Sequence, residues 1–339
     1  VEIMSMTRRS FLQRTALSGL TIGAAITGTK RAAQAADMSE PLTTVIDLNK
    51  CNGCPDLDTP RCVAACRNKN NERFPQPIKP IQDYWPQTKH EDWSEKQNLT
   101  NRLTPYNWTY VQHITVEHNG KKQNLHIPRR CMHCNSATCA DLCPFGVIDQ
   151  TAKGPVVINT GACFGGAKCR DVCPWHIPQR QAGVGIYLDI APTYAGGGVM
   201  YKCDLCADLL EKGQEPACVS ACPTGALMIG PRRKMEAYAD KWRADNNGYI
   251  YGRDENGGTS TFYLSKVPFG KINEALLNQE IDEKPGRPAM PPGIDNPLHS
   301  TDGAVKSMLV APFAGLAAAG ISAYKIMTKG EKENENSEA

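Results

Sequence analysis

The chain has 339 residues, of which 41% are hydrophobic and 22% are charged. This length allows one large domain or two modest ones, and the composition excludes both a disordered protein and a polytopic membrane protein. The formal net charge is +3, but the first 36 residues hold five basic side chains and one acidic one, so the remainder has 33 basic and 34 acidic residues. A nucleic-acid-binding surface is therefore not expected. The sequence also has no P-loop and no Gly-x-Gly-x-x-Gly turn, so the common phosphate-binding loops are absent.

The first residues have the organisation of an export signal. The segment TRRSFLQ, which contains Arg8 and Arg9, is followed by an uncharged stretch over 15–29 and by a small-residue site over 33–35. A charged segment, an apolar segment and small residues in this order are typical of a secretory signal, and TRRSFLQ resembles the twin-arginine motif. We predict a twin-arginine signal peptide over 1–35. The alternative is a basic amphipathic N-terminal helix.

The 15 cysteines fall into four groups. Three groups are complete and end in a C-x3-C spacing: Cys51, Cys54, Cys62 and Cys66; Cys131, Cys134, Cys139 and Cys143; and Cys203, Cys206, Cys218 and Cys222. The remaining group has only Cys163, Cys169 and Cys173. Its spacing matches the C-x2-C-x2-C-x3-C run of ferredoxins if the absent second cysteine stood at Gly166.

These spacings are typical of paired iron–sulfur clusters. Several thiolates from one tight loop hold a cluster, and the last cysteine of the run ligates the other cluster. Pro144, Pro174 and Pro223 directly follow three of the last cysteines and turn the chain away from the ligand. Zinc, which favours paired C-x2-C knuckles, and a disulfide framework are the alternatives. No C-x-x-C is followed by His, which excludes attached c-type haem.

Other elements are predicted between and after the cysteine groups. Alternating residues over 109–117 and the Asn119-Gly120 turn predict a hairpin with 123–127. A short strand is expected over 156–158 and a helix over 232–246. We expect the basic pair Arg129-Arg130 to be solvated or paired with acidic neighbours. Trp175, His176 and Arg180 are expected to cover a cluster, with a quinone or partner contact as the alternative.

A second uncharged segment lies near the C-terminal end. It comprises 18 residues over 307–324, between Lys306 and Lys325, and this is the lower limit of length for a transmembrane helix. We predict a transmembrane helix over 307–325 and a cytoplasmic tail over 326–339, because the lysines that follow favour the cytoplasmic side. The alternative is a buried Ala-rich helix of the soluble body.

With these cysteine groups, the chain resembles the four-cluster ferredoxin-like iron–sulfur beta subunits of the dimethyl-sulfoxide-reductase family. It is similar in particular to their exported, membrane-anchored branch, found with periplasmic hydrogenases and high-molecular-weight cytochrome complexes. The resemblance covers 47–232, with Gly166 as a departure, and extends to later segments and both ends. It implies an α+β fold with two interlocked bacterial-type 2x4Fe-4S ferredoxin-like modules over 41–230 and an insertion over 69–127. An extension with a Pro-rich spacer would follow over 231–304.

The resemblance also implies which cysteines share a cluster, since the first group pairs with the fourth and the second with the third. The implied ligand sets are Cys51, Cys54, Cys62 and Cys222; Cys203, Cys206, Cys218 and Cys66; Cys131, Cys134, Cys139 and Cys173; and Cys163, Cys169 and Cys143, where Gly166 replaces the fourth ligand. Because glycine has no ligating atom, we predict three 4Fe-4S clusters and one 3Fe-4S cluster of higher potential. The alternative is four 4Fe-4S clusters, one of them completed by water or by a side chain such as His176.

The function expected from these features is electron transfer. We predict a subunit without a catalytic residue that relays single electrons on the periplasmic side of a bacterial cytoplasmic membrane. Its expected partners are an integral membrane quinone- or haem-binding subunit and a periplasmic catalytic or cytochrome subunit, in a hydrogenase or cytochrome complex. The alternatives are a beta subunit of a periplasmic molybdopterin reductase and a structural adaptor with redox-silent clusters.

Overall fold

The computed structural model describes residues 40–83, 90–190, 192–193, 197–279 and 285–298. The predicted signal peptide over 1–35, the predicted transmembrane helix over 307–325 and the tail over 326–339 lie outside these ranges. Within them, no helix combines the length and the apolar character that crossing a bilayer requires.

A four-stranded sheet joins the start of the described chain to its later part. β1 (Leu42–Asp47) pairs antiparallel with β8 (Leu227–Pro231) and parallel with β10 (Thr261–Ser265), which pairs antiparallel with β9 (Tyr249–Tyr251). β1 is a run of β-branched and apolar residues that ends in Asp47, and five of its six side chains are buried. Such a run fits a central strand that is covered on both faces.

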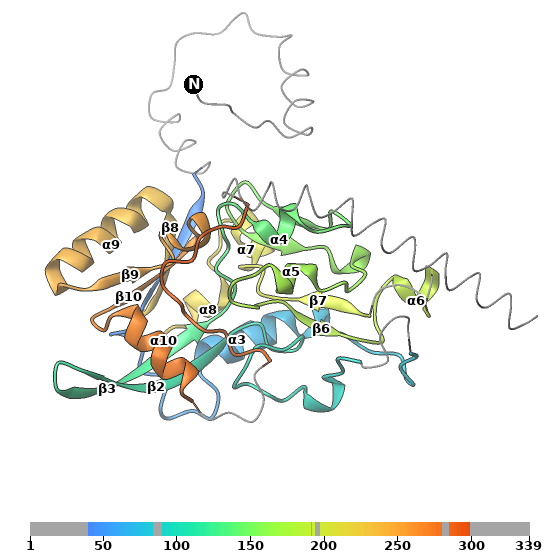
Figure 1. Ribbon diagram of the computed structural model, residues 1–339, viewed down its shortest axis with the longest axis horizontal. Helices are drawn as coiled ribbons and strands as arrows, with labels where there is room; N and C mark the ends of the chain where they lie inside the picture. Colours follow the sequence, from blue (N-terminus) through green and yellow to red (C-terminus); the bar gives the residue numbers. More distant parts are fainter. Residues whose placement is uncertain (1–39, 84–89, 191, 194–196, 280–284, 299–339) are drawn as a thin grey trace, which may run out of the picture. The chain divides into compact units, whose positions relative to one another are not determined.

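The helix α9 (Arg232–Asn246) covers one part of this sheet, beside β8 and β9 (Figure 1). Its Ala239 packs with Val45, Phe262 and Leu264 of the sheet. The helix begins after Pro231, which cannot extend it backward, and ends at Asn247 in the left-handed conformation common after a helix. The helix predicted over 232–246 is confirmed.

The predicted hairpin is also confirmed. It consists of β2 (Tyr110–His118) and β3 (Lys121–Arg129), with Tyr110 opposite Arg129 and His118 opposite Lys121. Both turn residues have positive φ, 53° at Asn119 and 69° at Gly120, which is the conformation of a two-residue hairpin turn. The helix α10 (Phe269–Leu277) lies across β2 (Figure 1).

The cysteine groups are carried by short elements. The last but one cysteine of each group lies in a helix and the last lies four residues later, so the C-x3-C spacing separates the two thiols by about one helical turn. These helices are α3 (Arg61–Asn70), α4 (Thr138–Asp141), α5 (Lys168–Asp171) and α8 (Ala217–Ser220). Two small antiparallel sheets lie between the groups: β4 (Ile148–Gln150) with β5 (Val156–Ile158), and β6 (Gln179–Gln181) with β7 (Val199–Tyr201). The strand predicted over 156–158 is therefore present.

The remaining described elements are short. They are η1 (Asn71–Arg73), η2 (Ser94–Lys96), η3 (Thr160–Ala162), α6 (Tyr187–Ile190), α7 (Ala207–Glu211) and η4 (Glu255–Gly257). The main hydrophobic core includes seven of the cysteines among its buried members, and six more pack against it. The fold is thus organised around its thiols.

The Pro-rich run differs from the spacer expected of it, because its described part packs on the body. Leu103 N–H donates to the Gly286 carbonyl at 2.8 Å, and Asn256 N–H donates to the Ile294 carbonyl at 2.6 Å. Met290 is 1% exposed. Prolines restrict the unfolded chain, so an extended segment that is rich in them loses less conformational entropy when it docks.

Candidate iron-sulfur sites

The structure brings the 15 cysteines together in four sets. Set A contains Cys51, Cys54, Cys62 and Cys222; set B contains Cys66, Cys203, Cys206 and Cys218; set C contains Cys131, Cys134, Cys139 and Cys173; and set D contains Cys143, Cys163 and Cys169. Each set draws thiols from two of the four groups: sets A and B from the first and fourth, and sets C and D from the second and third. These are the sets that the family resemblance implied.

Sets A and D each line a cavity. The set A cavity is closed by Val111, Leu227 and neighbouring loop residues. The pKa of Cys51 is raised to about 11, because burial and the nearby Cys222 and Cys54 raise it by more than the Gly53 N–H lowers it. Thiols in such sites give up their protons when a metal binds as a Lewis acid.

Set B is the most deeply enclosed, since all four of its cysteines are buried, whereas three of the four in set C are half-buried. Burial raises the pKa of Cys66, and the charges of Cys203, Cys218 and Cys206 raise it further. Cys134 shows the same effect in set C, first from burial and then from Cys173 and Cys131. The mutual electrostatic effects show that the thiols of each set converge.

The four sets follow one another in a row. Cys62 of set A is close enough to Cys218 of set B for their charges to interact. Cys203 of set B interacts in the same way with Cys131 of set C. Cys169 of set D interacts with Cys139 of set C. The order is therefore A, B, C and D.

Gly166 lines the set D cavity together with the three thiols. A Cβ atom built there would meet no atom within 4 Å, and its φ lies outside the left-handed region. Gly165 is different, because its φ is +69° and a Cβ atom would lie 2.3 Å from the Gly198 carbonyl oxygen. Neither backbone conformation nor packing thus requires a glycine at 166, and the set lacks a thiol only because of the residue type.

Several N–H groups point at cysteine sulfurs. Asn256 Nδ2 donates to Cys134 Sγ at 3.3 Å, Leu205 N–H to Cys203 Sγ at 3.3 Å, and Gly165 N–H to Cys163 Sγ at 3.4 Å. Hydrogen bonds to sulfur are a common means of tuning iron–sulfur clusters. The donor set therefore fits sulfur-ligated iron.

The two alternatives for the cysteines find no support in the described residues. All 15 cysteines lie in the described ranges and none is in a disulfide. Nor do the described residues include a group of three or more His, Cys, Asp or Glu side chains that could hold a single metal ion.

The expectation for Arg129-Arg130 is wrong. Arg129 is 3% exposed and Arg130 is 1% exposed. Arg130 Nη1 donates to Cys203 Sγ at 3.9 Å, while its Nε and Nη2 atoms have no partner among the described residues. Lys202, which the sequence analysis did not single out, is 7% exposed and lies near thiols of sets B and C.

A sequence signal for these two cations exists but is weak. Arg130 directly precedes Cys131, and Lys202 directly precedes Cys203. Lys50 precedes Cys51 in the same way and is exposed. The position alone therefore does not predict burial.

Trp175, His176 and Arg180 have different surroundings. Trp175 is buried and its Nε1 donates to Tyr251 Oη at 2.7 Å. Arg180 Nη1 donates to the Gly165 carbonyl at 2.9 Å, so this buried side chain braces the set D loop. His176 is exposed, and its Nδ1 lies 3.1 Å from the Arg170 carbonyl.

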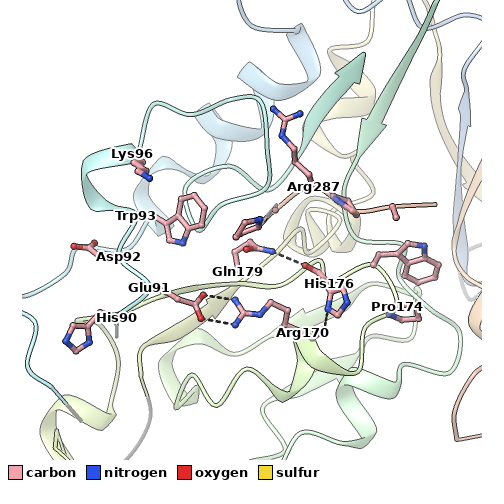
Figure 2. Close-up of a pocket in the computed structure, with 15 residues that line it drawn as sticks. His90, Glu91, Asp92, Trp93, Lys96, Arg170, Pro174, His176, Gln179 and Arg287 are labelled. Atoms are coloured by element: carbon pink, nitrogen blue, oxygen red, sulfur yellow. Dashed lines mark hydrogen bonds and ion pairs between the residues drawn. The ribbon is translucent and has the colours of Figure 1, made fainter. Parts of the chain in front are cut away.

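His176 lines a pocket of about 690 Å³. Figure 2 shows it next to Pro174 and the ion pair between Arg170 and Glu91. Trp93 and Arg287 lie on other walls of this pocket. His176 is not among the residues that line the set D cavity. The structure therefore does not bring it to Gly166 as a replacement ligand.

Comparisons with known proteins agree with an iron–sulfur protein. One family model described as a 4Fe-4S dicluster domain matches residues 50–147, and another of the same description matches 123–232. The formate dehydrogenase-O iron–sulfur subunit of Escherichia coli K12 is 31% identical over 268 residues, which are 77% of this chain and 76% of that protein.

Two further relatives come from the same genus. The iron–sulfur subunit of the nitrate-inducible formate dehydrogenase of Escherichia coli K12 is 26% identical over 327 residues, 92% of each chain. The hydrogenase-2 operon protein HybA of Escherichia coli O157:H7 is 26% identical over 313 residues, 80% of this chain and 85% of HybA. The predicted iron–sulfur, ferredoxin-like class with dicluster domains is thus confirmed. The chain belongs to the family of iron–sulfur electron-transfer subunits that includes the formate dehydrogenase-O subunit.

Proposed function

We propose that this chain is the electron-transfer subunit of a membrane-associated oxidoreductase complex, in which it holds four iron–sulfur clusters in a row. The observation that carries the proposal is the continuous order of sets A to D, in which thiols of each set interact with thiols of the next. A row of this kind fits the relay of electrons between two partners better than it fits chemistry at a single site. Iron–sulfur clusters supply one-electron oxidation and reduction.

Sets A, B and C each offer four thiols and would each hold a 4Fe-4S cluster. Set D offers three, and we assign it a 3Fe-4S cluster. Support for this assignment comes from Gly166, where a fourth thiol would fit without a steric clash but is not present. His176 lies in another pocket, which argues against it as a fourth ligand.

The proposed location is the periplasmic face of a bacterial cytoplasmic membrane. The twin-arginine segment around Arg8 and Arg9 supports export, and the uncharged segment over 307–324 supports a membrane anchor. The proposed partners are an integral membrane quinone- or haem-binding subunit and a periplasmic catalytic or cytochrome subunit. The relatives named for formate dehydrogenase and for the hydrogenase-2 operon support membership of such a complex.

A structural adaptor with redox-silent clusters is the competing function. Purification of the native complex, identification of its subunits and a redox titration of its clusters would separate the two. Clusters that change oxidation state reversibly support electron transfer, whereas clusters that stay in one state across physiological potentials contradict it. The identity of the co-purifying catalytic subunit decides between a hydrogenase or cytochrome complex and a molybdopterin reductase.

A further inference from the structure

Two buried cations lie where set B meets set C. Arg130 is 1% exposed and directly precedes Cys131 of set C, while Lys202 is 7% exposed and directly precedes Cys203 of set B. Lys202 Nζ donates to the carbonyl of Cys203 at 3.1 Å and to the carbonyl of Val156. A buried charge is costly unless it is paired or well hydrogen-bonded, so residues of this kind need a compensating partner.

For Arg130, the compensating partners in the described residues are sulfur atoms. Its Nη1 donates to Cys203 Sγ at 3.9 Å. None of the ion pairs in the described residues joins it to a carboxylate, and the nearby Asp204 is paired with Arg73 at 2.6 Å. The Nε and Nη2 atoms of Arg130 are buried without a partner in the described residues. Guanidinium N–H groups are donors only, so these two atoms call for acceptors.

His133 does not supply that acceptor or a competing charge. It is fully buried, and its Nδ1 accepts a hydrogen bond from Val156 N–H at 3.0 Å. A ring nitrogen that accepts from a backbone N–H belongs to a neutral imidazole. His133 therefore adds no positive charge, and the buried cations at this point of the row are Arg130 and Lys202.

We propose that Arg130 is a positioning residue that raises the reduction potential of the set B cluster by holding a permanent positive charge and N–H donors against its sulfurs. Reduction adds one negative charge to a cluster, and a nearby cation stabilises the reduced form more than the oxidised one. This inference rests on the proposed function, since it requires a cluster in set B. It assigns to a residue outside the cysteine sets a specific effect on one cluster.

The neighbouring Arg129 provides a matched control. It is the last residue of the strand β3, and Arg130 follows that strand. Arg129 is also buried, but its Nη2 donates to the Ala289 carbonyl at 2.8 Å, on the Pro-rich run. The variants R129Q and R130Q thus each remove one positive charge from a buried position. Only R130Q removes a charge that lies beside a cysteine sulfur.

The test is a redox titration of the loaded native complex, followed by electron paramagnetic resonance, for the wild type and for R129Q, R130Q and R130K. At a fixed solution potential, R130Q is expected to lower the ratio of reduced to oxidised set B cluster about tenfold, a shift of about 59 mV for a one-electron couple. R130K retains the charge and is expected to shift much less, and R129Q is expected to leave the ratio unchanged. A fully loaded R130Q complex with the wild-type ratio, or a shift of equal size in R129Q, would overturn the inference.

The wild-type titration separates this outcome from a failure of the proposed function. If wild-type clusters do not titrate, the relay itself is refuted; if they titrate and R130Q does not differ, only the role of Arg130 is refuted. If the R130Q chain does not bind its clusters, a second measurement on the wild-type protein still tests the inference. In wild-type protein labelled with 15N-arginine, the reduced cluster is expected to show a nitrogen hyperfine coupling that disappears in R130K, and absence of that coupling in the wild type would overturn the inference.

Discussion

Substitution of Gly166 by cysteine tests the assignment of set D. The variant supplies a fourth thiol at a position where a Cβ atom meets nothing within 4 Å. No steric penalty is therefore expected, and replacing a glycine outside the left-handed region changes the free energy of unfolding by no more than about 1 kcal/mol. The bound iron should rise by about one atom per chain, from about 15 to about 16, as a 3Fe-4S cluster becomes a 4Fe-4S cluster.

The assay is iron analysis combined with electron paramagnetic resonance of oxidised and reduced protein. The oxidised wild type should show the signal of a 3Fe-4S cluster, because its odd electron count makes it paramagnetic, whereas oxidised 4Fe-4S clusters are diamagnetic. In Gly166→Cys that signal should vanish, and a new signal of lower potential should appear on reduction.

Gly165→Cys is the matched control. At this neighbouring position φ is +69° and a Cβ atom would lie 2.3 Å from the Gly198 carbonyl oxygen, so the substitution should distort the loop and lower the iron content. An anaerobically purified wild type without the oxidised signal would refute the assignment. It would instead indicate a 4Fe-4S cluster whose fourth iron is held by a ligand other than cysteine.

Three further predictions concern other parts of the chain. Cys62→Ser leaves set A with three thiols, as in set D, so the iron content should fall by about one atom per chain or more, and unchanged iron would contradict the ligand assignment. Replacement of Arg8 and Arg9 by lysine should leave the chain in the cytoplasm. Truncation after Lys306 should instead give an exported protein that cell fractionation finds detached from the membrane. A truncated chain that stays bound to the membrane without partner subunits would argue against the anchor. Glu91, which accepts hydrogen bonds from two arginines, has a pKa below its ordinary value: burial raises it, but the arginines lower it by more. Because this pKa is depressed in the fold, the carboxylate stabilises the protein above the ordinary pKa of about 4.3 and the contribution is lost as the pH falls below it. Glu91→Gln should therefore lower the thermal midpoint by a similar amount from pH 8 to pH 6, and a midpoint equal to the wild type would contradict the role of this ion pair.

Local features of the fold were predictable because the signals for them are local. The Asn119-Gly120 pair specifies a turn with two positive φ angles, and the hairpin follows directly from it. The helix over 232–246 has a proline before it and an asparagine after it, which define both of its ends. The parallel pairing of β1 with β10 joins residues more than 200 positions apart, and no local pattern indicates it.

The cysteine spacings predict that clusters exist, but they do not predict which groups meet in space. The implied sets came from the resemblance to a family, and the structure supplies the contacts that group the thiols. Arg130 was misjudged because charged residues are rarely buried without an acidic partner, and its hydrogen-bond acceptor is a thiol from a distant group. Sequence alone gives no indication of such a partner.

The central claim is that the four cysteine sets form one redox-active row. The most direct test is a potentiometric titration of the purified native complex, monitored by electron paramagnetic resonance and calibrated by iron analysis. Four reversible one-electron transitions are expected, together with about 15 iron atoms per chain and one signal that is present only in the oxidised state. Loaded clusters that do not change oxidation state across this titration, or fewer than four clusters in the intact protein, would contradict the claim.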